Sequence, residues 1–231
     1  MRKAHLAAAL FAGVVSACAP LLPPPEEGPV QAPADFPERY YQETAAQGKA
    51  VFRVDPARSI IVIEARRGGS LVRFGHDHVI ASHDVTGYVA PGEGRADLYV
   101  PLERLVVDEA ELRAQAGFDT TPSEADIAGT RANMLEQVLQ TRQHPFALVH
   151  LRGVAASGAS LLNVAITLRG VTRERQVPAQ IEAGTDGFGA SGSLALNQTD
   201  FGIPPFSILG GAIRVQDRLD LRFRILAVPL D

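Results

Sequence analysis

The chain of 231 residues has a single cysteine, Cys18, no tryptophan and only two methionines. One cysteine excludes an intrachain disulfide framework and any zinc site built from several cysteines. There is also no apolar run of the roughly 20 residues that a transmembrane helix needs. The net charge is −4, with 22 basic against 26 acidic residues. Because nucleic-acid binding requires a basic surface, we expect no nucleic-acid partner.

Catalytic motifs are missing as well. The sequence contains no Gly-X-Ser-X-Gly elbow, no P-loop and no dinucleotide fingerprint after a strand. A cysteine nucleophile is not expected either, because Cys18 lies at the end of an N-terminal targeting segment. We therefore expect a protein that is not an enzyme and requires no cofactor.

The N-terminus has the layout of a targeting signal. Arg2 and Lys3 precede an apolar run over residues 6–15, and Val15-Ser16-Ala17 leads into Cys18. This resembles a bacterial lipoprotein signal with its lipobox; the alternative is an ordinary signal peptide that contains a cysteine. The resemblance implies a signal peptide over residues 1–17, an acylated Cys18 at the mature N-terminus, and, from Ala19, sorting to the periplasmic side of the outer membrane.

Proline dominates the next segment, residues 18–48, which we interpret as the lipidated cysteine and a tether. Proline-rich chains favour an extended, semi-rigid geometry. Tyr40 and Tyr41 are expected to begin the contact with the following domain, residues 49–231. The prolines of the segment are Pro20, Pro23, Pro24, Pro25, Pro29, Pro33 and Pro37.

Residues 49–231 alternate between apolar and polar with period two, which predicts strands with one buried face. Glycine-rich punctuation between the strands indicates an all-β fold, either a sandwich or a barrel, and a region of this length can close into an antiparallel barrel of about eight strands. One segment differs: Ser123–Leu139 has a helical period, with Ser123 as a plausible N-cap and Gly129 inside it, so one helix or two short ones are expected. This helical excursion would cover one side or one opening of the barrel.

Several short motifs carry a family resemblance. They are Val54-Asp55-Pro56-Ala57-Arg58-Ser59, then Leu168-Arg169-Gly170-Val171-Thr172, and finally Thr199-Asp200-Phe201-Gly202-Ile203. In this order and spacing they resemble the YceI-like family of bacterial polyisoprenoid-binding proteins. The resemblance implies a lipocalin-like barrel that holds an amphiphilic or isoprenoid lipid in its interior; the alternation by itself leaves barrel and sandwich open.

A lipid tail requires apolar walls, which inward-facing strand residues would supply. The alternative is that the same side chains fill the core. The expected wall residues are Phe146, Leu148, Leu162, Val164, Ile166, Leu168, Leu219, Leu221, Phe223 and Ile225. For a charged head group we expect an arginine, with Arg131 in the helical excursion as first candidate.

The stretch Phe74-Gly75-His76-Asp77-His78 carries the most suggestive chemistry. In a strand, His76 and His78 point to the same side and could contact a ligand head at the barrel rim, next to Phe74. Alternatively, His76, His78 and His83 could bind zinc or copper. A third hypothesis is a barrel that serves as a scaffold for a protein partner. The favoured function is a lipid-anchored periplasmic protein that binds a lipid without covalent chemistry.

Overall fold

The computed structural model describes residues 30–154, 157–184 and 187–230. Within them the chain forms three α-helices and twelve strands. The helices are α1 (Glu38–Ala46), α2 (Ala110–Ala116) and α3 (Glu124–Asn133), and a π-helical turn, η5 (Met134–Val138), continues α3. The strands are β1 (Phe52–Val54), β2 (Ile60–Gly68), β3 (His78–Ser82), β4 (Thr86–Ala90), β5 (Arg95–Pro101), β6 (Val106–Val107), β7 (Phe146–Arg152), β8 (Gly158–Leu168), β9 (Val171–Gly184), β10 (Gly187–Asn197), β11 (Ser207–Ile208) and β12 (Ile213–Pro229).

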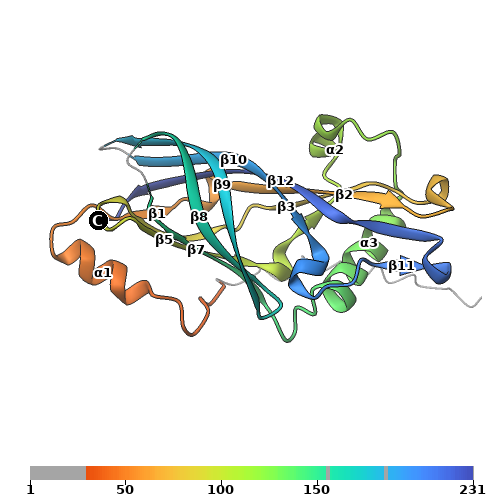
Figure 1. Ribbon diagram of the computed structural model, residues 1–231, viewed down its shortest axis with the longest axis horizontal. Helices are drawn as coiled ribbons and strands as arrows, with labels where there is room; N and C mark the ends of the chain where they lie inside the picture. The colour runs from red at the N-terminus through yellow and green to blue at the C-terminus, as the bar shows by residue number, and fades with distance from the viewer. Residues whose placement is uncertain (1–29, 155–156, 185–186, 231) are drawn as a thin grey trace, which may run out of the picture. The chain divides into compact units, whose positions relative to one another are not determined.

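The strands close into an antiparallel barrel of eight staves (Figure 1). The order β1-β4-β5-β7-β8-β9-β10-β12 returns to β1, because β12 pairs with both β10 and β1. After a short break, β2 continues β1 along β12, and β3 pairs with β2. Closure leaves no open edge along the ring, as in lipocalin-like folds. The expected all-β barrel of about eight strands is thus confirmed, and residues 31–231 form one compact unit.

Alternation along each long strand places one face inside the barrel. On β12, Leu219, Leu221, Phe223 and Ile225 point inward, with charged residues between them facing out. Gly192 of β10 lies opposite Phe223. A Cβ at Gly192 would lie 2.9 Å from Phe223 Cζ and 2.4 Å from the Pro178 carbonyl oxygen, so glycine makes room here for the aromatic ring.

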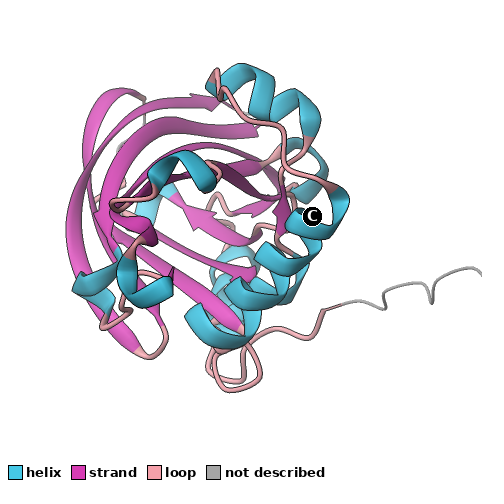
Figure 2. Cartoon of the chain, turned by 90° about the vertical axis from the view of Figure 1, so that its right-hand side faces the viewer, coloured by secondary structure: helices cyan, strands magenta, loops and turns pink. Residues whose placement is uncertain are grey.

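Helix α3 lies at one end of the barrel, which Figure 2 views end-on. Ser123 is its N-cap and forms a capping box with Asp126, which satisfies free backbone N–H groups of the first turn. Ile127 of α3, together with Met134 and Val138 of η5, packs on the barrel core. The expected helix over 123–139 is therefore present, and Gly129 does not divide it. No described helix is both long and apolar enough to span a membrane.

Helix α1 covers the outer face of β4 and β5. Tyr41 is completely buried, stacks on Tyr88 and donates a hydrogen bond to Asp97 at 2.6 Å. Residues 38–46 were expected to be part of the tether. They instead belong to the folded unit, because their aromatic side chains cover apolar residues outside the barrel; the expected contact of Tyr41 is confirmed.

Candidate ligand-binding site

The barrel encloses a cavity of about 650 Å³. This volume falls within the range of about 300–1,000 Å³ that is typical of sites for small ligands. Most of its walls are aliphatic or aromatic side chains, among them Ile181 of β9 and Phe188 of β10. The alternative that the side chains fill the core completely is therefore wrong.

Eleven of the fourteen residues expected to bind a ligand line this cavity. They are Phe74, His76, His78, Leu162, Val164, Ile166, Leu168, Leu219, Leu221, Phe223 and Ile225. The long strands β8 and β12 contribute eight of them, since each has a single apolar face and the choice of inward residues is unambiguous.

Phe146 and Leu148 do not line the cavity; the expectation for these two residues was wrong. Their neighbours on β7, Ala147 and Val149, face inward instead. Phe146 packs edge-on against Tyr99 on the outer face of the sheet, with ring centroids 5.5 Å apart. The first half of β7 is apolar on both faces, because Phe146 packs against Tyr99 outside the barrel, so the pattern there does not reveal which face is inside.

Arg131 is the third expected ligand-binding residue that does not line the cavity. Its guanidinium donates hydrogen bonds to the backbone carbonyls of Leu105 and Glu103, and the residue does not line the cavity. Arg131 thus ties α3 to the segment before β6. Of the cavity-lining arginines, Arg67 at the end of β2 is held by Asp119 at 2.7 Å and by Asp77.

Polar lining residues gather at one end of the cavity, called here the mouth. The end of β2, the start of β3 and the start of β12 meet there by strand register, and α3 lies across them. The mouth residues are Arg67, His76, His78, Asp126, Thr130, Asn133, Asn197, Gln198 and Arg214. Within the described chain, Ser82 is the polar lining residue outside this group, at the far end of β3.

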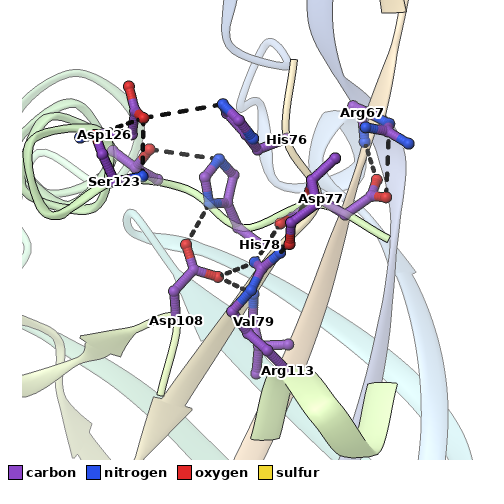
Figure 3. Close-up of polar contacts among 11 residues, drawn as sticks. Arg67, His76, Asp77, His78, Val79, Asp108, Arg113, Ser123 and Asp126 are labelled. Carbon is purple, nitrogen blue, oxygen red and sulfur yellow. Dashed lines mark hydrogen bonds and ion pairs between the residues drawn. The ribbon is translucent and has the colours of Figure 1, made fainter. Parts of the chain in front are cut away.

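His78 is held in place by a buried carboxylate (Figure 3). Its Nδ1 lies 2.6 Å from Asp108 Oδ2, while Asp108 Oδ1 accepts from the backbone N–H of Val79 at 3.0 Å and from Arg113. In the neutral imidazole this pairing places the proton on Nδ1 and leaves Nε2 as an acceptor. Nε2 lies 3.4 Å from Thr130 Oγ1 of α3.

Asp108 is ionised in this setting. Burial by itself would raise its pKa, but the hydrogen bonds from His78, from Val79 N–H and from Arg113 outweigh that effect and hold the pKa below its ordinary value. The carboxylate therefore orients the imidazole of His78 over the whole physiological range of pH.

His76 lies beside His78, with ring centroids 6.2 Å apart. Its Nε2 is 4.0 Å from Asp126 Oδ2 in the capping box of α3. Its Nδ1 is buried and has no hydrogen-bond partner among the described residues. Since buried polar atoms are rarely left without a partner, this nitrogen is available to a ligand's polar group.

The expected metal trio is not brought together. His83 lies beyond the far end of β3 and pairs with Glu109 at 2.9 Å. Among the described residues, no group of three or more His, Cys, Asp or Glu side chains is arranged to hold a metal ion. The reason is the extended strand: five residues of β structure separate His78 from His83 by roughly 16 Å.

Sequence reasoning missed Asp108, Arg113 and Thr130. Asp108 has a positive φ of 60° just after β6, and the pairing of β6 with β3 places it beside His78, 30 residues earlier. Only the tertiary contact identifies it. Thr130 lies within the expected helix, but nothing in the sequence marks its side chain as part of a site. Cys18 and the N-terminal signal peptide lie outside the described residues.

Comparison with known proteins is consistent with this barrel. The sequence profile of the YceI-like domain matches residues 52–227. Two solved structures share the fold. One is a polyisoprenoid binding domain from Saccharophagus degradans implicated in plant cell wall breakdown, with 11% identity and a TM-score of 0.57 over 79% of this chain and 100% of that chain. The other is BcnA from Burkholderia cenocepacia, with 13% identity and a TM-score of 0.51 over 76% of this chain and 99% of that chain.

No match was found among curated proteins. At identities this low, the two solved structures show a shared fold, and the similarity supports no statement about function. The profile match extends over most of the chain and includes every stave of the barrel. The chain therefore belongs to the YceI-like family.

Proposed function

We propose that this protein binds an amphiphilic lipid of the isoprenoid class in the barrel cavity, without covalent chemistry. The observation that carries the proposal is the division of the cavity into a long apolar interior and a mouth where the polar groups gather. A hydrocarbon chain fits the interior, and the lipid's polar end remains at the mouth.

The driving force is burial of the tail. Each Å² of apolar surface removed from water contributes about 25 cal/mol, or about 0.8 kcal/mol for each methylene. Away from the mouth, the lining is aliphatic and aromatic, and Ser82 is the described side chain there that offers a competing hydrogen bond. Branched isoprenoid tails suit walls of Leu, Ile and Val because shape is the only specificity available there.

The head group meets His76 and His78. With Asp108 holding Nδ1, His78 Nε2 accepts a hydrogen bond from a ligand hydroxyl when neutral and donates one to an anionic oxygen when protonated. His76 Nδ1 adds a second, unused hydrogen-bonding atom. Thr130 lies within reach of the same position.

The isoprenoid class is supported by the structural relative from Saccharophagus degradans, which is described as a polyisoprenoid binding domain. We extend the proposal to the location: Cys18 is acylated, and the protein is held at the periplasmic face of the outer membrane. The lipobox-like Val15-Ser16-Ala17-Cys18 supports this placement. Radiolabelled palmitate should enter the full chain and not its Cys18→Ser variant; equal labelling would contradict the anchor.

Native mass spectrometry of protein purified without detergent tests the binding. We expect a co-purifying lipid in the wild type and a strong reduction in Ala190→Phe, because Ala190 lines the cavity on β10 and a phenyl ring would occupy the space of the tail. Ala195→Phe is the matched control, since Ala195 lies on the same strand and is exposed. Absence of lipid from the wild type, or equal loss in both variants, would overturn the proposal.

A further inference from the structure

Exposed apolar side chains are concentrated beside the mouth of the cavity. Val72 and Phe74 follow β2 in the turn η2 (Val72–Phe74), and Ile208 and Leu209 lie where β11 meets the turn η7 (Leu209–Gly211). Their exposed fractions are 39%, 59%, 48% and 70%. These four, called here the lip, are the majority of the six exposed large apolar residues in the described chain. Exposed apolar groups gathered at one place mark an interaction site.

The two halves of the lip come from segments about 130 residues apart, and the fold joins them. Leu71 N–H donates to the Ala212 carbonyl at 2.8 Å, and Ile208 pairs with Ile213 of β12. Gly69 makes the close approach possible: its φ is +95°, and a Cβ there would lie 2.3 Å from the Ala212 oxygen. Backbone contacts therefore hold the two segments of the lip together as one surface.

The lip is continuous with the cavity. Phe74 and Ile208 line the cavity and are also exposed outside it, and Ile213, the strand partner of Ile208, lines the cavity too. A lipid tail leaving the mouth next to Phe74 meets apolar side chains before it meets water. Figure 1 places β11 and the end of β2 at the same end of the barrel as α3.

The segments that form the lip are basic, whereas the whole chain is acidic. Residues 68–76 and 201–214 contain no Asp or Glu but include Arg73 and Arg214, while the whole chain carries −4. Both arginines are exposed, and neither forms an ion pair among the described residues. Arg73 lies over the ring of Phe74, 4.7 Å from its centroid. Apolar side chains flanked by unpaired cations match an anionic lipid surface.

We propose that the lip inserts into the surface of a lipid bilayer, with Arg73 and Arg214 on anionic head groups, and that the cavity takes up and releases its ligand there. This inference rests on the proposed function for the identity of the cargo. Insertion seals the mouth against the bilayer, so that the tail moves between two apolar phases without crossing water.

A fluorescent probe on the lip tests insertion directly in the full chain. In a Cys18→Ser background, an environment-sensitive fluorophore is attached at Ser207→Cys, beside the lip, or at Ser193→Cys, on the exposed face of β10. Vesicles of phosphatidylcholine, or of equal parts phosphatidylcholine and phosphatidylglycerol, carry brominated acyl chains as quenchers. The site-specific signal separates lip insertion from any adsorption of the N-terminal segment.

We expect a blue shift and quenching of the probe at 207, stronger with phosphatidylglycerol, and no change at 193. Val72→Ser with Leu209→Ser should abolish the quenching, and Arg73→Gln with Arg214→Gln should remove the preference for phosphatidylglycerol. An unquenched probe at 207 with both vesicles would overturn the proposal. So would equal quenching at both positions, or a blue shift without vesicles that grows with protein concentration and indicates a second copy on the lip.

Native mass spectrometry of the Val72→Ser/Leu209→Ser variant separates this inference from the proposed function, because neither Val72 nor Leu209 lines the cavity. Retained lipid with lost quenching supports both the proposed lipid binding and the insertion of the lip. Retained lipid with unchanged quenching rejects the lip alone, whereas a wild-type protein without lipid rejects the cavity function, whatever the probe reports.

Discussion

Two buried carboxylates each organise a histidine and an arginine, with different consequences. Asp108 orients His78 at the mouth of the cavity. Asp97, on the outer face of β5, accepts hydrogen bonds from Tyr41 of α1, from Arg95 and from His150 of β7. Asp108 therefore serves the site, and Asp97 holds α1 on the barrel. Neither role can be predicted from the sequence around the aspartate, because every partner except Arg95 and Arg113 is distant in the chain.

Asp97 should make the stability of the protein depend on pH under acidic conditions. Burial raises its pKa, but the hydrogen bonds from His150, Tyr41 and Arg95 prevail and lower the pKa from 3.8 to about 2. A carboxyl group with a lowered native pKa stabilises the fold fully above its unfolded pKa, and this stability is lost as the pH falls to the native pKa. The loss expected between pH 4 and 2 is about 2 kcal/mol, at about 1.4 kcal/mol per unit.

Urea unfolding at a series of pH values measures this effect. The slope between pH 4 and 2 should be smaller in Asp97→Asn than in the wild type. Asp35→Asn is the control, because Asp35 is exposed and forms no ion pair among the described residues. Identical slopes in Asp97→Asn and the wild type would show that Asp97 does not carry the acid sensitivity.

At the scale of elements, α3 is the helix that lines the mouth. It is capped by Ser123 and Asp126, placed by Arg131 on two carbonyls, and contributes Thr130 to the site. The helix was predictable because its cap and its period are local in sequence. The sequence left open whether the helix covers a side or an opening of the barrel. The packing of Met134 and Val138 on the core decides between the two.

Removing the cap should loosen the cover of the mouth. Ser123→Ala deletes the oxygen that accepts the Asp126 N–H at 3.2 Å, and the expected cost is about 1 kcal/mol in the free energy of unfolding. Hydrogen exchange should accelerate in the first turn of α3 and leave β8 and β9 unchanged. Ser193→Ala, an exposed serine on β10, controls for the loss of a hydroxyl. Unchanged exchange in α3 would contradict the role of the cap.

At the scale of the molecule, the empty cavity lowers the free energy of unfolding, and a bound ligand can offset this loss. Voids in a protein core forfeit van der Waals contacts, so a barrel with about 650 Å³ of interior space is less stable empty than filled. A lipid that binds only the folded state adds RT ln(1 + [L]/Kd) to the stability, about 2.7 kcal/mol at a hundredfold excess over Kd.

Delipidation should therefore lower the melting temperature. Protein stripped of lipid on a hydrophobic resin is expected to melt several degrees below the protein as purified, and polyprenol in mixed micelles should restore the difference. Ala190→Phe should melt at the same temperature before and after stripping, because its phenyl ring blocks the space of the tail and the variant carries little lipid to remove. A wild type that melts identically in both states would count against a ligand that supports the barrel.

The sequence by itself determined the half-buried strands, the capped helix and the family resemblance that implied the barrel, because period-two alternation, a Ser123 cap and short motifs are local properties of the chain. It also identified the inward faces of β8 and β12, where only one face is apolar. Tertiary structure decided the rest. The inward face of β7 was ambiguous because Tyr99 and its neighbours make the outer face apolar too. The partner of His78 and the two halves of the lip come from distant parts of the chain, which only strand pairing brings into contact.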